Sequence, residues 1–245
     1  MNRYFWNQHL IRRLALLGLF LITPSGSLAD DTHTSDSWQR FERRVRDGEI
    51  GLEEGRAEVA SWSEILERSY PSQEFERRIY FPLKRYGVPS IGGKNGEGYQ
   101  PAGYEFLGGN RHKGHPAQDI FIHDHGQDGS DDRTGRPAEV LSFADGVVLS
   151  SFAQWAPDQA CRHIRGGNYI WIYHPALGIF SYYAHLRDVH VELGQRVEGG
   201  AAIATLGRTG INAYPSRSPT HLHFMLLRAR DMSPVDAYPL FTKSP

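Results

Sequence analysis

From residue 138 onward, the chain is a series of short segments rich in β-branched and aromatic residues. Gly, Pro and Asp turns separate the segments VLSFADGVVLSSF, NYIWIYH, GIFSYYAHL, AAIATLG and HLHFMLLR. Segments of this kind are typical of β-strands. Their connections show no helix-length hydrophobic period, so the crossovers that parallel strands require are missing. The pattern predicts a mainly β fold built on an antiparallel sheet.

Residues 35–67 follow a helical period instead. Trp38, Phe41 and Val45 lie three and four positions apart, and this spacing resumes after the pair Asp47–Gly48. Gly is a frequent residue at the end of a helix, and Asp–Gly pairs are typical of turns. We therefore predict an N-terminal helical segment made of two short helices with a break at this pair.

The first 29 residues have the pattern of a secretory signal peptide. Basic residues precede an apolar run at residues 14–22, and the small residues Ser27 and Ala29 follow it. The run is too short for a membrane-spanning helix, which needs about 20 residues. We predict cleavage after Ala29 and export to the periplasm or the cell exterior, with no stable membrane anchor afterwards. The predicted organisation is a signal peptide at residues 1–29, a helical segment at residues 30–79 and a β domain at residues 80–245.

Charge and cysteine content narrow the function further. The chain has 27 Lys and Arg against 28 Asp and Glu, so it has no overall basic field for a nucleic-acid backbone, and we expect no nucleic-acid partner. Cys161 is the only cysteine, which excludes an intrachain disulfide, and no neighbouring motif points to a reactive thiol. We expect a monomer.

The last apolar segment begins with two histidines, His221 and His223. Residues two apart on a strand point to the same face, so the two imidazoles are expected side by side. Leu222 and Phe224 then point to the opposite face, and a strand with apolar residues on both faces is expected to be covered on both sides.

A second pair, His115 and Asp119, precedes a short apolar run and is spaced so that both side chains can face one way. Imidazole and carboxylate groups are common zinc ligands. Two His and one Asp would leave the fourth position of a tetrahedral zinc open, as in catalytic zinc sites. His185 lies in another predicted strand and adds a further imidazole.

Taken together, these motifs resemble the lysostaphin-type zinc metallopeptidases, the M23 or LytM-domain family. The resemblance covers roughly residues 80–228, and the motifs occur in the order typical of the family. They are HxxxD at residues 115–119, AEVLSFADGVVLS at 138–150, GNYIWIYH at 167–174, YYAHL at 182–186, AAIATLGRTG at 201–210 and THLHF at 220–224. The resemblance implies an open antiparallel β-sheet with a groove, preceded here by the N-terminal helical segment.

The resemblance also implies roles for individual residues. One Zn²⁺ would be held by His115, Asp119 and His223, and a zinc-bound water would be the nucleophile. His185 and His221 would remain unligated as the catalytic histidines, and the sequence does not decide which of them is the general base. The implied function is a secreted zinc metalloendopeptidase that hydrolyses peptide cross-links or stem-peptide bonds of bacterial peptidoglycan.

Three further residues are candidates for the surroundings of the site. Tyr183 adjoins the motif that contains His185, and Tyr104 lies in the loop region before HxxxD; both are candidates for the groove wall. Asn110 lies where some latent relatives place an Asn that blocks the zinc, so inhibition by Asn110 or by the N-terminal helices is a hypothesis.

Two other functions compete with this interpretation. The family includes LytM-type regulators that activate other cell-wall hydrolases without cutting, and these typically lack zinc ligands, whereas this chain keeps all five residues. A phosphocarrier with two facing histidines has a related β architecture. Such carriers act in the cytoplasm, which disagrees with the predicted signal peptide, and HxxxD would then have no role.

Overall fold

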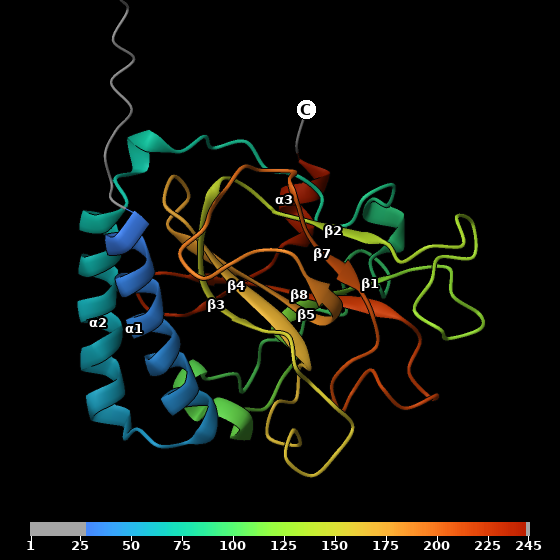
Figure 1. The fold of residues 1–245 in the computed structure, drawn as a ribbon, viewed down its shortest axis with the longest axis horizontal. Helices are drawn as coiled ribbons and strands as arrows, with labels where there is room; N and C mark the ends of the chain where they lie inside the picture. Colours follow the sequence, from blue (N-terminus) through green and yellow to red (C-terminus); the bar gives the residue numbers. More distant parts are fainter. Residues whose placement is uncertain (1–27, 244–245) are drawn as a thin grey trace, which may run out of the picture.

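A computed structural model describes residues 28–243 as an antiparallel sheet with two helices against one side (Figure 1). The sheet order is β1-β8-β5-β4-β3-β6, while β7 pairs with β2 and β5, and β9 pairs with β8. The path from β1 to β6 does not close, so the predicted open antiparallel sheet is confirmed. The strands are β1 Ala117–Phe121, β2 Glu139–Leu141, β3 Gly146–Phe152, β4 Asn168–His174, β5 Ile179–Val189, β6 Arg196–Val197, β7 Ala202–Leu206, β8 His221–Arg228 and β9 Pro234–Val235.

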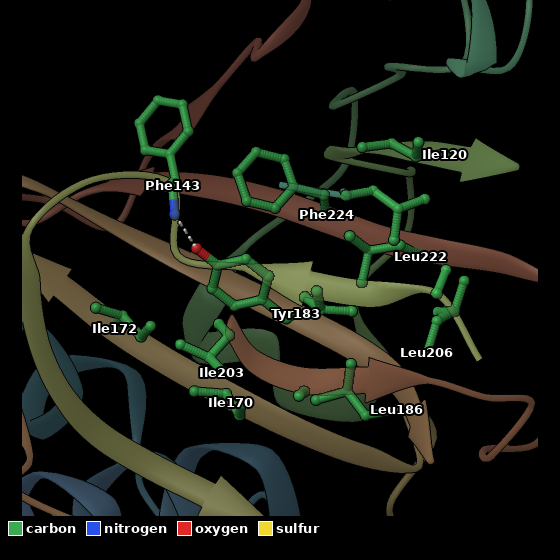
Figure 2. Close-up of a cluster of buried hydrophobic side chains, with 14 of the residues drawn as sticks. Ile120, Phe143, Ile170, Ile172, Tyr183, Leu186, Ile203, Leu206, Leu222 and Phe224 are labelled. Atoms are coloured by element: carbon green, nitrogen blue, oxygen red, sulfur yellow. Dashed lines mark hydrogen bonds between the residues drawn. The ribbon is translucent and has the colours of Figure 1, made fainter. Parts of the chain in front are cut away.

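The sheet is buried on both faces, and β8 shows how its sequence achieves this. Leu222 and Phe224 pack in one hydrophobic core, while Met225 and Leu227 pack in the other. Figure 2 shows the first core, where the Tyr183 hydroxyl accepts a hydrogen bond from the backbone N–H of Phe143 at 2.8 Å. Strict alternation along β8 therefore places successive side chains in different cores, as predicted.

The predicted pair of N-terminal helices is confirmed as α1 (Leu28–Asp47) and α2 (Leu52–Ser69), which lie side by side in Figure 1. The chain turns between them at Gly48, whose φ of 74° suits glycine. α1 covers one face of the sheet, because the Trp38 ring stacks on Phe180 with centroids 5.0 Å apart and meets Trp171 at 5.7 Å. The helical segment thus shares a core with the sheet.

The remaining helical elements are short. They are the 3-10 turns η1 Ser72–Glu74, η2 Val88–Ser90 and η3 Phe106–Arg111, and the helix α3 Tyr238–Thr242. None of the helices among residues 28–243 is long and apolar enough to cross a membrane. The predicted signal peptide has its basic and apolar parts outside the described residues.

His174, predicted to be in the sheet, is fully buried in β4. Its Nδ1 lies 2.9 Å from the carbonyl oxygen of Asp145 and its Nε2 lies 2.7 Å from the Ser181 hydroxyl. Burial lowers the pKa of His174 from 6.5 to about 4. Between pH 4 and pH 6.5, therefore, this histidine binds a proton in the unfolded chain but not in the folded chain.

The unfolding free energy is therefore expected to fall by about 3 kcal/mol as the pH drops from 6.5 to 4 through His174 alone. Urea denaturation measured across this pH range checks the prediction. In His174→Gln this part of the pH dependence should disappear. An equally steep pH dependence in the variant would contradict the assignment.

Candidate metal centre

The pairing of β1 with β8 brings the two sequence motifs together. Asp119 is the register partner of His223, so a residue of HxxxD directly faces a residue of HxH. The Asp119 Oδ1 lies 3.0 Å from His223 Nδ1 and 3.3 Å from His115 Nε2. One donor atom of each of the three side chains lies within 4.8 Å of the others. The three predicted ligands therefore converge as two nitrogens and one oxygen.

His115 precedes β1, and the glycine-rich segment before it fixes its ring. The backbone of His115 forms a bridge with Gln100, and its Nδ1 lies 2.8 Å from the carbonyl oxygen of Gly98. In this arrangement Nδ1–H donates to the carbonyl, so Nε2 is the ring nitrogen that faces Asp119. Outer hydrogen bonds of this kind orient histidine ligands in metal sites.

The charges of the three side chains depend on one another. Burial opposes ionisation of Asp119, but hydrogen bonds from His115 and His223 outweigh it and hold its pKa well below the usual range. The hydrogen bond to Asp119 raises the pKa of His115, whereas burial lowers that of His223. A carboxylate beside a neutral imidazole is the protonation state that binds a divalent cation.

The two remaining histidines lie beside this group. The His185 ring is centred 4.9 Å from that of His221 and 5.8 Å from that of His223. Their Nδ1 atoms lie 2.8 Å from the carbonyl oxygens of Thr209 and Pro219, respectively. The His221 Nε2 lies 3.8 Å from Asp119 Oδ2. Among residues 28–243, therefore, both rings make their hydrogen bond through Nδ1, and Nε2 lies on the opposite side of the ring with no hydrogen bond.

His185 reaches this position through a bulge in β5. Asn168 pairs with Leu186 while Ile170 pairs with Tyr183, so three steps on β5 match two on β4. His185 has φ of 66°, a left-handed conformation that is uncommon for a non-glycine residue. The extra residue turns His185 toward the histidine cluster, although Tyr183 two positions earlier faces a hydrophobic core. Burial, with the neighbouring His221 and His223, lowers the pKa of His185 to about 3.

The sequence of this region can be assigned to a known protein family. Residues 125–237 match the sequence profile of peptidase family M23. This part of the chain belongs to peptidase family M23. The matched region contains His185, His221 and His223, while His115 and Asp119 precede it and join it through β1. A comparison with curated proteins finds no match.

Solved structures similar to the chain include two peptidases and a pore-forming complex. A zinc-containing peptidase from Vibrio cholerae is 29% identical over 66% of this chain and 40% of that protein, with a TM-score of 0.42. The catalytic domain of lysostaphin from Staphylococcus simulans is 23% identical over 56% and 82%, with a TM-score of 0.39. The SpoIIQ–SpoIIIAH pore-forming complex is 20% identical over 54% and 67%, with a TM-score of 0.38. The chain thus spans less than half of the Vibrio protein.

A cavity of about 200 Å³ opens beside the histidines of the M23 site. Its lining includes His115, His185 and His223, and α1 closes part of it with Glu42 and Arg46. The other walls include the segment that contains η3, the loop before β4, and residues of β4 and β5. Among their side chains are Tyr104, Phe106, Asn110, Arg165, Tyr169, Trp171 and Tyr182.

The structure places the two candidate groove tyrosines differently. Tyr104 lines the cavity, and its ring meets that of His112 with centroids 4.8 Å apart. The prediction for Tyr183 is wrong: this residue is fully buried in the core on the other face of the sheet. The tyrosine of β5 that lines the cavity is Tyr182, whose ring is centred 6.2 Å from that of His223.

Asn110 also lines the cavity, but its hydrogen bonds run to a neighbouring loop. Its Nδ2 donates to the carbonyl oxygen of His163 at 2.7 Å, and its own carbonyl accepts from Arg165 Nη1 at 2.9 Å. Among residues 28–243, no hydrogen bond links Asn110 to His115, Asp119 or His223. The structure therefore holds Asn110 to this loop.

Proposed function

We propose that the M23 domain is a zinc metalloendopeptidase that hydrolyses peptide bonds in bacterial peptidoglycan. The observation that carries the proposal is the convergence of five side chains from distant parts of the sequence. Three of them can hold a metal, and two present a free imidazole nitrogen beside it. The rest of the proposed organisation is a signal peptide at residues 1–29, the helical segment 30–79 and the M23 domain at residues 80–245, acting as an exported monomer.

The donor set fits zinc. Two imidazole nitrogens and one carboxylate oxygen are ligands that zinc accepts, and three protein ligands leave a position open as in catalytic sites. His115, Asp119 and His223 would hold the ion. When bound in such a site, zinc polarises a carbonyl group and lowers the pKa of water. The hydrogen bond from His115 to Gly98 keeps one ligand nitrogen aimed at this position.

His185 and His221 supply the proton chemistry. The Thr209 and Pro219 carbonyls accept from the two Nδ1–H groups, so each Nε2 carries a lone pair that can take a proton from attacking water. The imidazolium formed can then donate that proton to the leaving amine or a hydrogen bond to the oxyanion. The hydrogen bonds at Nδ1 fix the tautomer of both rings, and the bulge in β5 also fixes the position of His185.

The decisive experiment is the release of peptide fragments from purified peptidoglycan by the protein. We expect new amino termini by mass spectrometry, complete inhibition by a chelator, and recovery when zinc is restored. Full binding of zinc with no fragments released by the folded protein would contradict the peptidase. In that case, stimulation of another cell-wall hydrolase by the same sample would support the LytM-type regulator.

A further inference from the structure

Two arginines line the cavity beside the metal centre, and they differ in their partners. Arg46 of α1 is held by Asp47, with its Nε 2.9 Å from Oδ1 and its Nη2 2.7 Å from Oδ2. Arg165 has no such partner: within residues 28–243 no carboxylate forms an ion pair with it. Its guanidinium makes one hydrogen bond, from Nη1 to the carbonyl oxygen of Asn110 at 2.9 Å.

The backbone around Arg165 is fixed on both sides. The carbonyl oxygen of Arg165 accepts a hydrogen bond from Ile211 N–H at 3.2 Å, and the preceding residue, Ile164, is buried. The following residue, Gly166, accepts a hydrogen bond from the backbone N–H of His185 at 2.8 Å. Arg165 is thus attached directly to the segment that positions a proposed catalytic histidine.

Among the described residues, the ionisable side chains that share the cavity with Arg165 do not occupy its N–H donors. His112 faces the same cavity, and burial lowers its pKa, with the positive charge of Arg165 as a further cause. The acidic residue that α1 contributes to the lining, Glu42, is buried and accepts a hydrogen bond from the Tyr169 hydroxyl at 3.1 Å. A guanidinium has five N–H donors, and Arg165 uses one of them in hydrogen bonds with residues 28–243.

We propose that Arg165 is a specificity residue that binds a free carboxylate of the peptide substrate in the cavity. Arginine presents two parallel N–H donors that match the two oxygens of a carboxylate. This inference rests on the proposed function, because it takes the ligand to be a peptide of peptidoglycan. The guanidinium provides binding and orientation, while bond cleavage belongs to the histidine cluster.

The test compares two forms of one probe. Soluble peptide fragments of purified peptidoglycan are used with their carboxylates free or converted to methylamides, and binding to the zinc-loaded protein is measured by calorimetry. We expect wild-type protein to bind the free carboxylate form about tenfold more tightly. Arg165→Gln should lose this preference, because the carboxylate form should bind as weakly as the methylamide form. Its affinity for the methylamide form should stay within about twofold of wild type.

Arg162→Gln is the matched control, because Arg162 lies in the same loop but is exposed and does not line the cavity. It should bind both forms like wild type. An unchanged preference in Arg165→Gln, no preference in wild type, or the same loss in Arg162→Gln would overturn the proposal. Carboxylate preference without any hydrolysis would leave the role of Arg165 standing and refute the peptidase. Hydrolysis of both forms without a binding preference would refute the role of Arg165 and leave the proposed peptidase standing.

Discussion

Replacing His223 with alanine is expected to remove the metal and the peptidase activity together. The Nδ1 atom of His223 lies 3.0 Å from Asp119 Oδ1 and 3.3 Å from His115 Nε2, and loss of His223 leaves two of the three proposed ligands. Loss of an outer-shell partner alone typically costs ten- to a hundredfold in metal affinity or activity, and loss of a ligand should exceed that. We therefore expect activity to fall by more than about a hundredfold. Zinc content by mass spectrometry, measured beside fragment release, checks both effects.

His190→Ala provides the control for this substitution, because His190 is an exposed histidine outside the site. It should retain one zinc and full activity. His223→Ala that still carries one zinc per chain would show that the metal ligands are assigned wrongly.

The second large effect is expected at His185, where substitution should leave the metal in place and remove most turnover. Among the described residues, the side chain of His185 forms its hydrogen bond with Thr209 and none with the three donors of the metal group. Positioned general acid–base groups contribute about a hundredfold to ten-thousandfold, so kcat should fall by this factor while zinc content stays at one. Steady-state kinetics and metal analysis on the same preparation measure both.

The positive φ of His185 requires two variants. His185→Ala places an ordinary residue in a left-handed conformation and carries a backbone cost of its own. His185→Asn is the better matched variant, because asparagine tolerates this conformation and its amide cannot take up the proton. Both variants should lose turnover to a similar extent and keep one zinc. Normal kcat in His185→Asn would rule out a proton-transfer role.

Much of the sheet was predictable because strand alternation is local. In β8 the period of two predicts His221 and His223 on one face, and in the structure both rings contact the ring of His185. The same rule explains why the prediction for Tyr183 failed. Tyr183 was predicted to line the groove because it lies close to His185 in the sequence. The bulge at His185 turns its side chain to the site, while Tyr183 stays in the core. A period of two gives no signal for an inserted residue, so only the register with β4 reveals it.

The cavity walls were less predictable, because they depend on contacts between distant loops. Arg165 lies in an irregular segment with no periodicity, and its proposed role follows only from its place in the cavity lining and its contact with Asn110. Tyr182 could have been found from the β5–β8 register, which pairs Tyr182 with Met225, two residues after His223. The resemblance to the family predicted the candidate metal ligands, because it depends on the order of motifs along the sequence. It does not require knowledge of which motifs are in contact.

The most direct test of the proposed zinc centre is a crystal structure of the protein grown with zinc, with anomalous diffraction recorded at the zinc absorption edge. We expect one peak about 2 Å from His115, Asp119 and His223, with His185 and His221 near the peak but not bound to it. A peak bound by His185 or His221 in place of one of these ligands, or no peak at this site, would contradict it.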